Sequence, residues 1–280
     1  MEMNYNYTAE QVAQIGETTF VHLQVREAEH VLHLRLDRAE KKNALNPTLL
    51  KELAFALNYA HYTDAVRLVV IGAEGNVFCA GADLKAFLGG GTAESTVPEP
   101  AGEVLPGELF RTLHKPSLVR VEGDVYAGGV LFLANATYVI AREGIRLALP
   151  ETRRGLFPFQ VMASLMEVMP PRRVLDWCIR GNDLALADAL AYGLVTQVVS
   201  AAEMDGAVET LVREITANSP VAIRLGLEAW DELRRLPAAE HHTYLRSMLF
   251  RAFQSPDARE GIAAFKEKRK PKWPEEISDG

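Results

Sequence analysis

Hydrophobic and polar residues alternate over residues 31–37, where three leucines share one face and a histidine and an arginine share the other. A period of two indicates a strand with one buried face. Asn46 and Pro47 then supply a helix N-cap and a first-turn proline, and leucines at helical spacing follow as far as Leu57. The apolar run at residues 67–72 indicates a second, buried strand. Because a helix separates the two strands, we expect them to pair in parallel.

The middle of the chain continues this alternation of strands and helices. Strands are predicted over residues 117–123 and 137–141, and an apolar helix is predicted to begin at Gly128 and Gly129 between them. A short helix is expected to end at Pro116. Strands that alternate with helices predict an α/β core.

Residues 89–107 are rich in Gly, Pro, Ser and Ala, which predicts a long loop and a candidate lid. Helical patterns dominate from residue 159 onward, interrupted by a strand predicted at 194–199. The last 80 residues carry amphipathic helices that could pack on their own core or on another subunit. This organisation predicts three parts: an N-terminal extension (1–19), an α/β core (20–199) and a helical C-terminal region (200–280).

The composition of the chain excludes several classes of protein. Of its 280 residues, 48% are hydrophobic and 24% are charged, which is ordinary for a globular protein that needs no structural metal. The formal net charge of −7 argues against a nucleic-acid binder but allows a local basic patch. Two cysteines make no disulfide framework, so we expect reduced thiols and a cytoplasmic location. No run of eighteen apolar residues occurs that would predict a membrane span.

Three segments stand out as candidates for chemistry: residues 78–85, 123–129 and 150–158. The first two follow predicted strands and are rich in small residues, which allow a ligand to approach the backbone closely. The glycines of the second open a helix, where backbone N–H groups lack intrahelical acceptors. The third segment contributes one carboxylate, Glu151.

Together with three other stretches, these segments resemble the enoyl-CoA hydratase/isomerase (crotonase) superfamily between about residue 20 and residue 270. Residues 37–45 (DRAEKKNAL) are similar to the family's "RPxxxNAL" segment, and 80–84 (AGADL) to its "AGADL" signature. Residues 181–199 and 264–269 look like the family's later helical motifs. The resemblance implies an α/β fold with a repeated ββα spiral core and a C-terminal α-helical trimerisation region.

The family's shared chemistry is stabilisation of a thioester enolate by two backbone N–H groups, which the resemblance assigns to Ala82 and Gly128. The substrate would be an acyl thioester of coenzyme A, or of a carrier protein, and no further cofactor is implied. By resemblance, the residues near coenzyme A would be Lys41, Lys42, Ala44, Ala80, Asp83, Leu84, Lys85 and Gly129. The acyl pocket would be lined by Phe87, Leu131, Phe157 and Phe159. In a trimer or hexamer, the last helix would reach a neighbour's ligand, and its candidate contacts are Phe265, Lys266 and Lys268.

The sequence departs from the family's hydratases at one catalytic position. Hydratases use two glutamates, of which the second maps to Glu151 and the first to Leu131. Leucine can neither accept a proton nor hold a water molecule. The glycine-rich stretch that usually follows the second glutamate is replaced by residues 157–160 (FPFQ), and neither Leu131 nor Phe159 supplies the acids of a dienoyl isomerase.

A single carboxylate still suffices to move a proton between two carbons, so enoyl-CoA isomerisation with Glu151 as the base is the favoured activity. One alternative is a hydratase that recruits Asp124 or Glu167. Another is decarboxylation or hydrolysis of a thioester, because an oxyanion pocket also serves those reactions. A third, of a different class, is a binder of acyl-CoA that has no catalytic activity.

Overall fold

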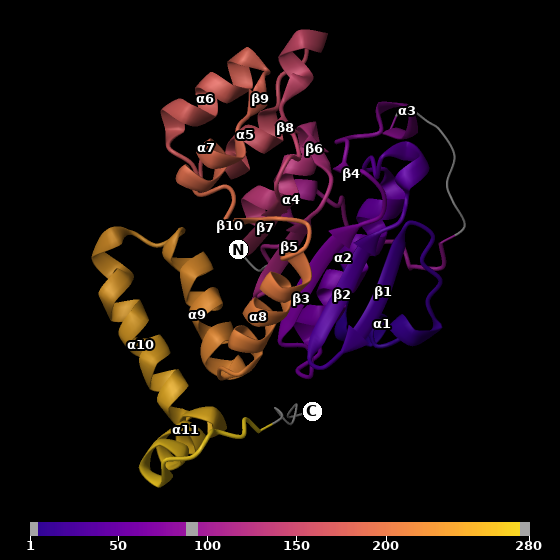
Figure 1. The fold of residues 1–280 in the computed structure, drawn as a ribbon. Helices are drawn as coiled ribbons and strands as arrows, with labels where there is room; N and C mark the ends of the chain where they lie inside the picture. The colour runs from indigo at the N-terminus through magenta and orange to yellow at the C-terminus, as the bar shows by residue number, and fades with distance from the viewer. Residues whose placement is uncertain (1–4, 88–94, 275–280) are drawn as a thin grey trace.

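The larger of two β-sheets has six strands and forms the centre of the molecule (Figure 1). The computed structural model describes residues 5–87 and 95–274. In spatial order the strands are β1 (Leu23–Ala28), β2 (Val31–Leu36), β3 (Leu68–Ala73), β5 (Ser117–Val121), β7 (Tyr138–Arg142) and β10 (Gln197–Val199). Only the β1–β2 hairpin is antiparallel among these pairings. The parallel pairing of β2 with β3 confirms the crossover predicted from the sequence.

A second, smaller sheet lies beside the first and carries the candidate site. Its order is β4 (Val77–Cys79), β6 (Asp124–Tyr126), β8 (Leu147–Ala148) and β9 (Asp183–Leu184). β4, β6 and β8 run parallel, and β9 pairs antiparallel with β8. These strands are two or three residues long, too short for the sequence pattern to predict.

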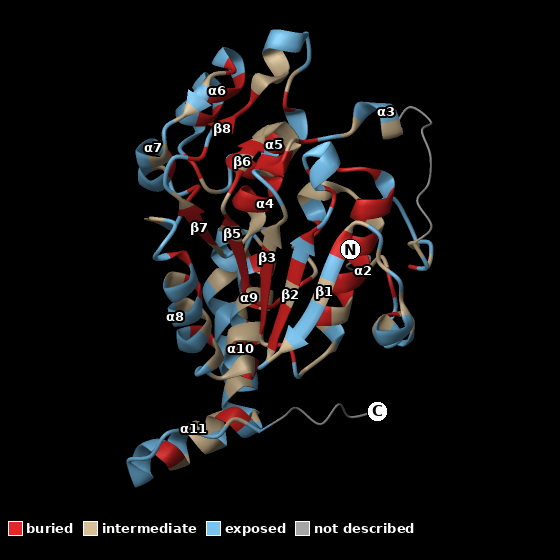
Figure 2. Cartoon of the chain, turned by 45° about the vertical axis from the view of Figure 1, so that its right-hand side comes forward, coloured by how far each residue is buried: buried red, intermediate tan, exposed pale blue. Residues whose placement is uncertain are grey.

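Several helices precede the C-terminal region. They are α1 (Ala9–Val12), α2 (Pro47–Tyr62), α3 (Leu84–Phe87), α4 (Val130–Asn135), α5 (Phe159–Leu165), α6 (Pro171–Arg180) and α7 (Leu186–Ala191). The α2 helix begins as predicted, since the Asn46 side chain accepts from Leu49 N–H at 2.8 Å. It buries all four of its leucines against one face of the large sheet, and Figure 2 shows these central elements in red. Tyr7 and Val12 belong to the same core, so the N-terminal segment packs on the α/β unit.

The C-terminal region consists of α8 (Met204–Thr216), α9 (Pro220–Leu233), α10 (His241–Gln254) and α11 (Pro256–Glu267). α8 packs on the opposite face of the large sheet, where Met204 and Val208 meet apolar strand residues. α9 and α10 share a small core of their own that includes Leu225 and Met248. Figure 1 shows α10 and α11 projecting away from the sheets. Within the described residues, no helix combines the length and apolar character that crossing a membrane would need.

The remaining expectations for the elements had mixed outcomes. The strands predicted at 117–123 and 137–141 are present as β5 and β7 with slightly different ends, and the predicted strand at 194–199 shortens to β10. The short helix predicted before Pro116 was wrong, because the chain there forms a 3₁₀ turn at Pro106–Glu108 followed by irregular turns. Part of the predicted loop and lid, residues 89–94, lies outside the described residues.

Candidate active site

The carboxyl ends of β4, β6 and β8 lie next to one another in the small sheet. Because these strands are parallel neighbours, the residues that follow them leave the sheet at the same edge. Those residues are 80–82 after β4, 127–129 after β6 and 149–151 after β8. The small sheet therefore brings together the three segments that the sequence singled out as candidates for chemistry.

The first two of these turns pack directly against each other, backbone to backbone. A Cβ atom built on Gly81 would lie 2.6 Å from Cβ of Ala127 and 3.0 Å from N of Gly128. One built on Gly128 would lie 3.7 Å from N of Ala82. Gly81 has φ +87° and Ala127 has φ +50°, both in the left-handed region that glycine adopts without strain. The contact therefore leaves no room for a side chain at Gly81.

The backbone N–H groups of Ala82 and Gly128 are available to an external acceptor. Leu45 N–H donates to the Gly81 carbonyl at 2.8 Å, and Asp83 N–H donates to the Leu45 carbonyl at 2.7 Å. In such a bridge Ala82, which lies between the two bonded residues, points its own N–H away from Leu45. Residues 5–87 and 95–274 offer this N–H group no acceptor. Gly128 lies in the first turn of a helical segment, where N–H groups have no intrahelical acceptor. Two adjoining turns thus each present one N–H group.

The third segment, after β8, carries a buried carboxylate. Glu151 lies in the 3₁₀ turn Pro150–Arg154 and is half-buried. Its Oε2 atom is inaccessible to solvent and has no hydrogen-bond partner among the described residues. Burial raises the pKa of the Glu151 carboxyl, and its own backbone N–H and the nearby Arg154 only partly oppose this rise. A carboxylate oxygen that is desolvated and lacks a hydrogen-bond partner is typical of a functional site.

The α4 helix presents an apolar side chain, Leu131, at the position to which the resemblance assigns the first hydratase glutamate. Leu131 is buried, and a Cβ built on Gly107 would lie 3.8 Å from its Cδ2 atom. The rings of Phe157 and Phe159 are 5.1 Å apart, with Phe157 half-buried and Phe159 70% exposed. The Phe87 side chain lies outside the described part of the structure. Its predicted role in the acyl pocket, with those of Leu131, Phe157 and Phe159, stays a prediction.

Two lysines lie at the rim of the first turn. Lys41 and Lys42 are exposed, and the Lys42 carbonyl accepts from Ala80 N–H at 3.0 Å. Leu84 and Lys85 on α3 are also exposed, directly after the turn. The loop 38–45 and the 80–85 segment are therefore neighbours, as the predicted coenzyme A site requires.

Asp83 is occupied by contacts within the protein. Its Oδ2 atom receives Arg38 Nη2 at 2.9 Å, and its Oδ1 atom receives Ala86 N–H at 3.2 Å. The hydrogen bond from Arg38 lowers the pKa of Asp83. Arg38 also donates to the carbonyl of Ala44. It therefore links Ala44 and Asp83, two of the residues that the resemblance placed near coenzyme A. Arg38 was missed because its partner is 45 residues away, beyond the reach of any local pattern.

The last helix does not approach this site within one chain. Phe265, on α11, is 86% exposed. Lys268 is the C-cap residue directly after the end of this helix at Glu267. Figure 1 shows α11 at the opposite end of the molecule from α3. These two residues could reach a ligand only in a neighbouring copy, so their role stays a prediction.

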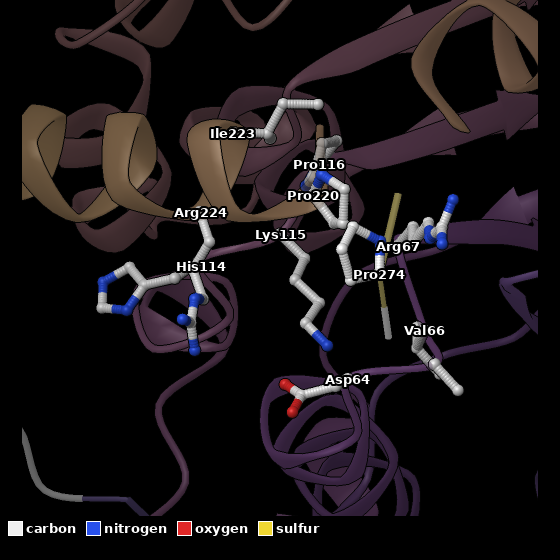
Figure 3. A pocket seen from close by; sticks show the side chains of 11 residues that line it. Asp64, Val66, Arg67, His114, Lys115, Pro116, Pro220, Ile223, Arg224 and Pro274 are labelled. Atoms are coloured by element: carbon white, nitrogen blue, oxygen red, sulfur yellow. The ribbon is translucent and has the colours of Figure 1, made fainter. Parts of the chain in front are cut away.

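A small cavity lies at the junction of the core and α9, away from the strand ends (Figure 3). Its volume is about 20 Å³, enough for one water molecule. The side chain of Lys115 extends toward Asp64 in this view, and its Nζ atom donates to the Thr63 carbonyl. None of the three segments at the strand ends contributes to the cavity. It is a gap between packed elements and is too small for an acyl thioester.

The family of the chain follows from comparison with known proteins. The sequence matches the enoyl-CoA hydratase/isomerase family over residues 26–276. The chain belongs to this family, which confirms the resemblance seen in its motifs, and it is an acyl-CoA enzyme of the crotonase fold.

Its relatives include the carnitinyl-CoA dehydratase of Escherichia coli K12, with 30% identity over 253 residues, 87% of this chain and 94% of that protein. Among solved structures, an enoyl-CoA hydratase from Mycobacterium tuberculosis H37Rv is 27% identical, with a TM-score of 0.80 over 90% of this chain and 98% of that one. An enoyl-CoA hydratase from Bacillus anthracis is 26% identical, with a TM-score of 0.80 over 91% of this chain and 100% of that one.

Proposed function

We propose that this protein is an enoyl-CoA isomerase that moves a double bond with one carboxylate, Glu151. Two features together carry the proposal. Glu151 Oε2 is buried and has no hydrogen-bond partner among the described residues, and Leu131 on α4 is buried and apolar. One side of the site has a base, and the position of a second acid is filled by hydrocarbon. Such a site suits proton transfer between carbons, which needs no positioned water.

The reaction would proceed through an enolate. The thioester oxygen of a 3-enoyl-CoA would accept hydrogen bonds from the N–H groups of Ala82 and Gly128. Glu151 would take a proton from the α-carbon, and the negative charge would pass to that oxygen, where the two fixed donors stabilise it. The same carboxyl would return the proton to the γ-carbon, leaving the double bond between the α- and β-carbons. The raised pKa of Glu151 favours both steps, because a pKa closer to neutral pH lets the same carboxyl both accept and return the proton.

The contacts of the other nearby acids argue against the hydratase alternative. Both oxygens of Asp124 are occupied, by Tyr126 Oη at 2.7 Å and Arg146 N–H at 2.8 Å. Glu167 is paired with Arg234. Each of these acids thus already has a partner within the protein, whereas Glu151 Oε2 has none among the described residues. The names of the relatives, hydratase and dehydratase, nevertheless make water addition the second candidate.

A substrate panel tests the proposal. We expect purified protein to convert 3-enoyl-CoA to 2-enoyl-CoA and to add water to crotonyl-CoA at least about 100 times more slowly. Calorimetry on the same thioesters measures binding separately from turnover. Fast hydration of crotonyl-CoA would identify a hydratase, and release of CO₂ or free thiol would identify a decarboxylase or hydrolase. Tight binding without any product would identify a silent binder, and the matching carrier-protein thioesters test the form of the substrate.

The two lysines at the rim are proposed to contact the phosphates of coenzyme A. Replacing Lys41 and Lys42 together with alanine is expected to raise KM about 10-fold, the cost of losing a charge-assisted contact, with kcat nearly unchanged. Steady-state kinetics at low and high salt check this. Lys272, an exposed lysine near the C-terminus, is the control position. An unchanged KM in the double variant would remove the lysines from the coenzyme A site.

The predicted trimer or hexamer is retained as a proposal. Its support is a set of large apolar side chains left exposed on the C-terminal helices: Trp230, Leu249, Phe250, Phe253, Ile262 and Phe265. Water-exposed apolar side chains in this number are typical of an interface. Light scattering of the purified chain measures its mass directly, and a monomer at working concentration would contradict the proposal.

A further inference from the structure

Arg38 is a buried arginine with partners on two separate segments. Its side chain is 10% exposed, and it donates to the Ala44 carbonyl at 3.0 Å and to Asp83 Oδ2 at 2.9 Å. A guanidinium removed from water must be satisfied within the protein, which makes these contacts costly to break. Arg38 therefore joins the loop 38–45 firmly to the segment after β4.

The loop that carries Arg38 is itself fixed to the core. Asn43 is fully buried, and its Oδ1 atom accepts from Arg38 N–H at 2.9 Å. Its Nδ2 atom donates to the carbonyls of Glu74 and Val77, each at 2.8 Å. These residues flank the turn between β3 and β4. The Arg38 side chain thus extends from a loop that is fixed to the core.

Asp83 directly follows the residue whose N–H group the reaction would use. The Gly81 carbonyl and Asp83 N–H bond to Leu45 on either side of Ala82, and this bridge turns the Ala82 N–H away from Leu45. The carboxylate of Asp83 adds a side-chain anchor at the same point. Without that anchor, the turn would be held by backbone hydrogen bonds and packing.

We propose that Arg38 is a positioning residue: through its ion pair with Asp83, it holds the Ala82 N–H group at the thioester oxygen. This inference rests on the proposed function. It predicts a selective effect on kcat, because misplacing one oxyanion donor reduces stabilisation of the transition state more than it weakens substrate binding.

The test compares Arg38→Met with a matched control, Arg35→Met. Arg35 also pairs with a carboxylate, Glu74 at 2.8 Å, but its side chain is 52% exposed. For Arg38→Met we expect kcat with 3-enoyl-CoA to fall about 10- to 100-fold, the range for misplaced catalytic groups, with KM changed less than about 3-fold. Arg35→Met should match the wild type. Arg38→Lys, which keeps the charge, should recover part of the loss.

A spectroscopic readout separates positioning from a merely structural role. The carbonyl stretch of a bound conjugated enoyl-CoA shifts to lower frequency when its oxygen is polarised by hydrogen bonds. We expect the wild type and Arg35→Met to show this shift and Arg38→Met to lose much of it. Asp83→Asn should behave like Arg38→Met, and if Arg38→Met fails to fold, Asp83→Asn and Arg38→Lys supply both readouts.

Two results would overturn the inference in different ways. If folded Arg38→Met keeps both the wild-type kcat and the full carbonyl shift, Arg38 does not position the donor, and the proposed function stands. If the wild type itself shows no carbonyl shift and no turnover, the oxyanion site fails and the inference fails with it.

Discussion

Replacing Glu151 with glutamine is expected to lower the rate of double-bond migration by about 10²- to 10⁴-fold, the usual contribution of a general base. The same substitution is expected to raise the melting temperature at neutral pH. Glu151 Oε2 is buried without a partner, so its ionised form is unfavourable in the folded protein, and a neutral amide of the same size removes that cost. The measurements are turnover of 3-enoyl-CoA and thermal unfolding of the same samples.

The pH dependence of both quantities has a definite sign. Burial raises the pKa of Glu151 in the folded state, so the folded protein binds this proton more tightly than the unfolded chain does. Stability should therefore fall as pH rises from the unfolded pKa through the raised folded pKa, and Glu151→Gln should lack this component. Activity should follow the opposite course, because the base must be ionised: kcat/KM should fall as pH drops through the raised pKa.

Glu143, an exposed glutamate after β7, provides the control. Glu143→Gln should change neither the rate nor the pH profile. If Glu151→Gln turned over 3-enoyl-CoA at the wild-type rate, Glu151 would not be the base.

Replacing Gly81 with alanine is expected to lower kcat by at least about 10²-fold, the loss seen when one oxyanion donor is removed. The new methyl group would lie 2.6 Å from Cβ of Ala127 and 3.0 Å from N of Gly128, so the two turns must move apart. The backbone at Gly81 is also left-handed, at φ +87°, which alanine adopts only with strain. Kinetics with 3-enoyl-CoA measure the loss, and circular dichroism verifies the fold.

The control substitution is Gly226→Ala in α9. Apart from the neighbouring backbone of α9 itself, no atom of the described residues lies within 4 Å of a methyl group built there, and alanine favours a helix by about 0.5–1 kcal/mol over glycine. This variant should be fully active and slightly more stable. Wild-type kcat in a folded Gly81→Ala protein would mean that the contact between the turns is not needed for catalysis.

Much of the large sheet could be predicted from the sequence, because β2, β3, β5 and β7 have five or six residues each and α2 is capped by a recognisable residue. The alternation over residues 31–37 became β2, and Asn46 caps α2 as expected. The small sheet could not be predicted in this way, since β4, β6 and β8 have at most three residues each. Periodicity needs more positions than that.

The candidate site was predicted in part, and for a similar reason. Glu151, Ala82 and Gly128 were identified through motifs, and the parallel strands of the small sheet explain why such distant segments meet. The ion pair between Arg38 and Asp83 was not foreseen, because only the folded chain brings its members together. Burial, which gives Glu151 its raised pKa, is likewise a property of the packed structure.

The most direct test of the central claim is a crystal structure of Glu151→Gln with a bound 3-enoyl-CoA. We predict that the thioester oxygen lies about 3 Å from both Ala82 N and Gly128 N, within hydrogen-bonding distance, with the side chain at position 151 facing the α-carbon. A thioester oxygen that contacts neither N–H group, or a residue 151 turned toward bulk solvent, would contradict the account.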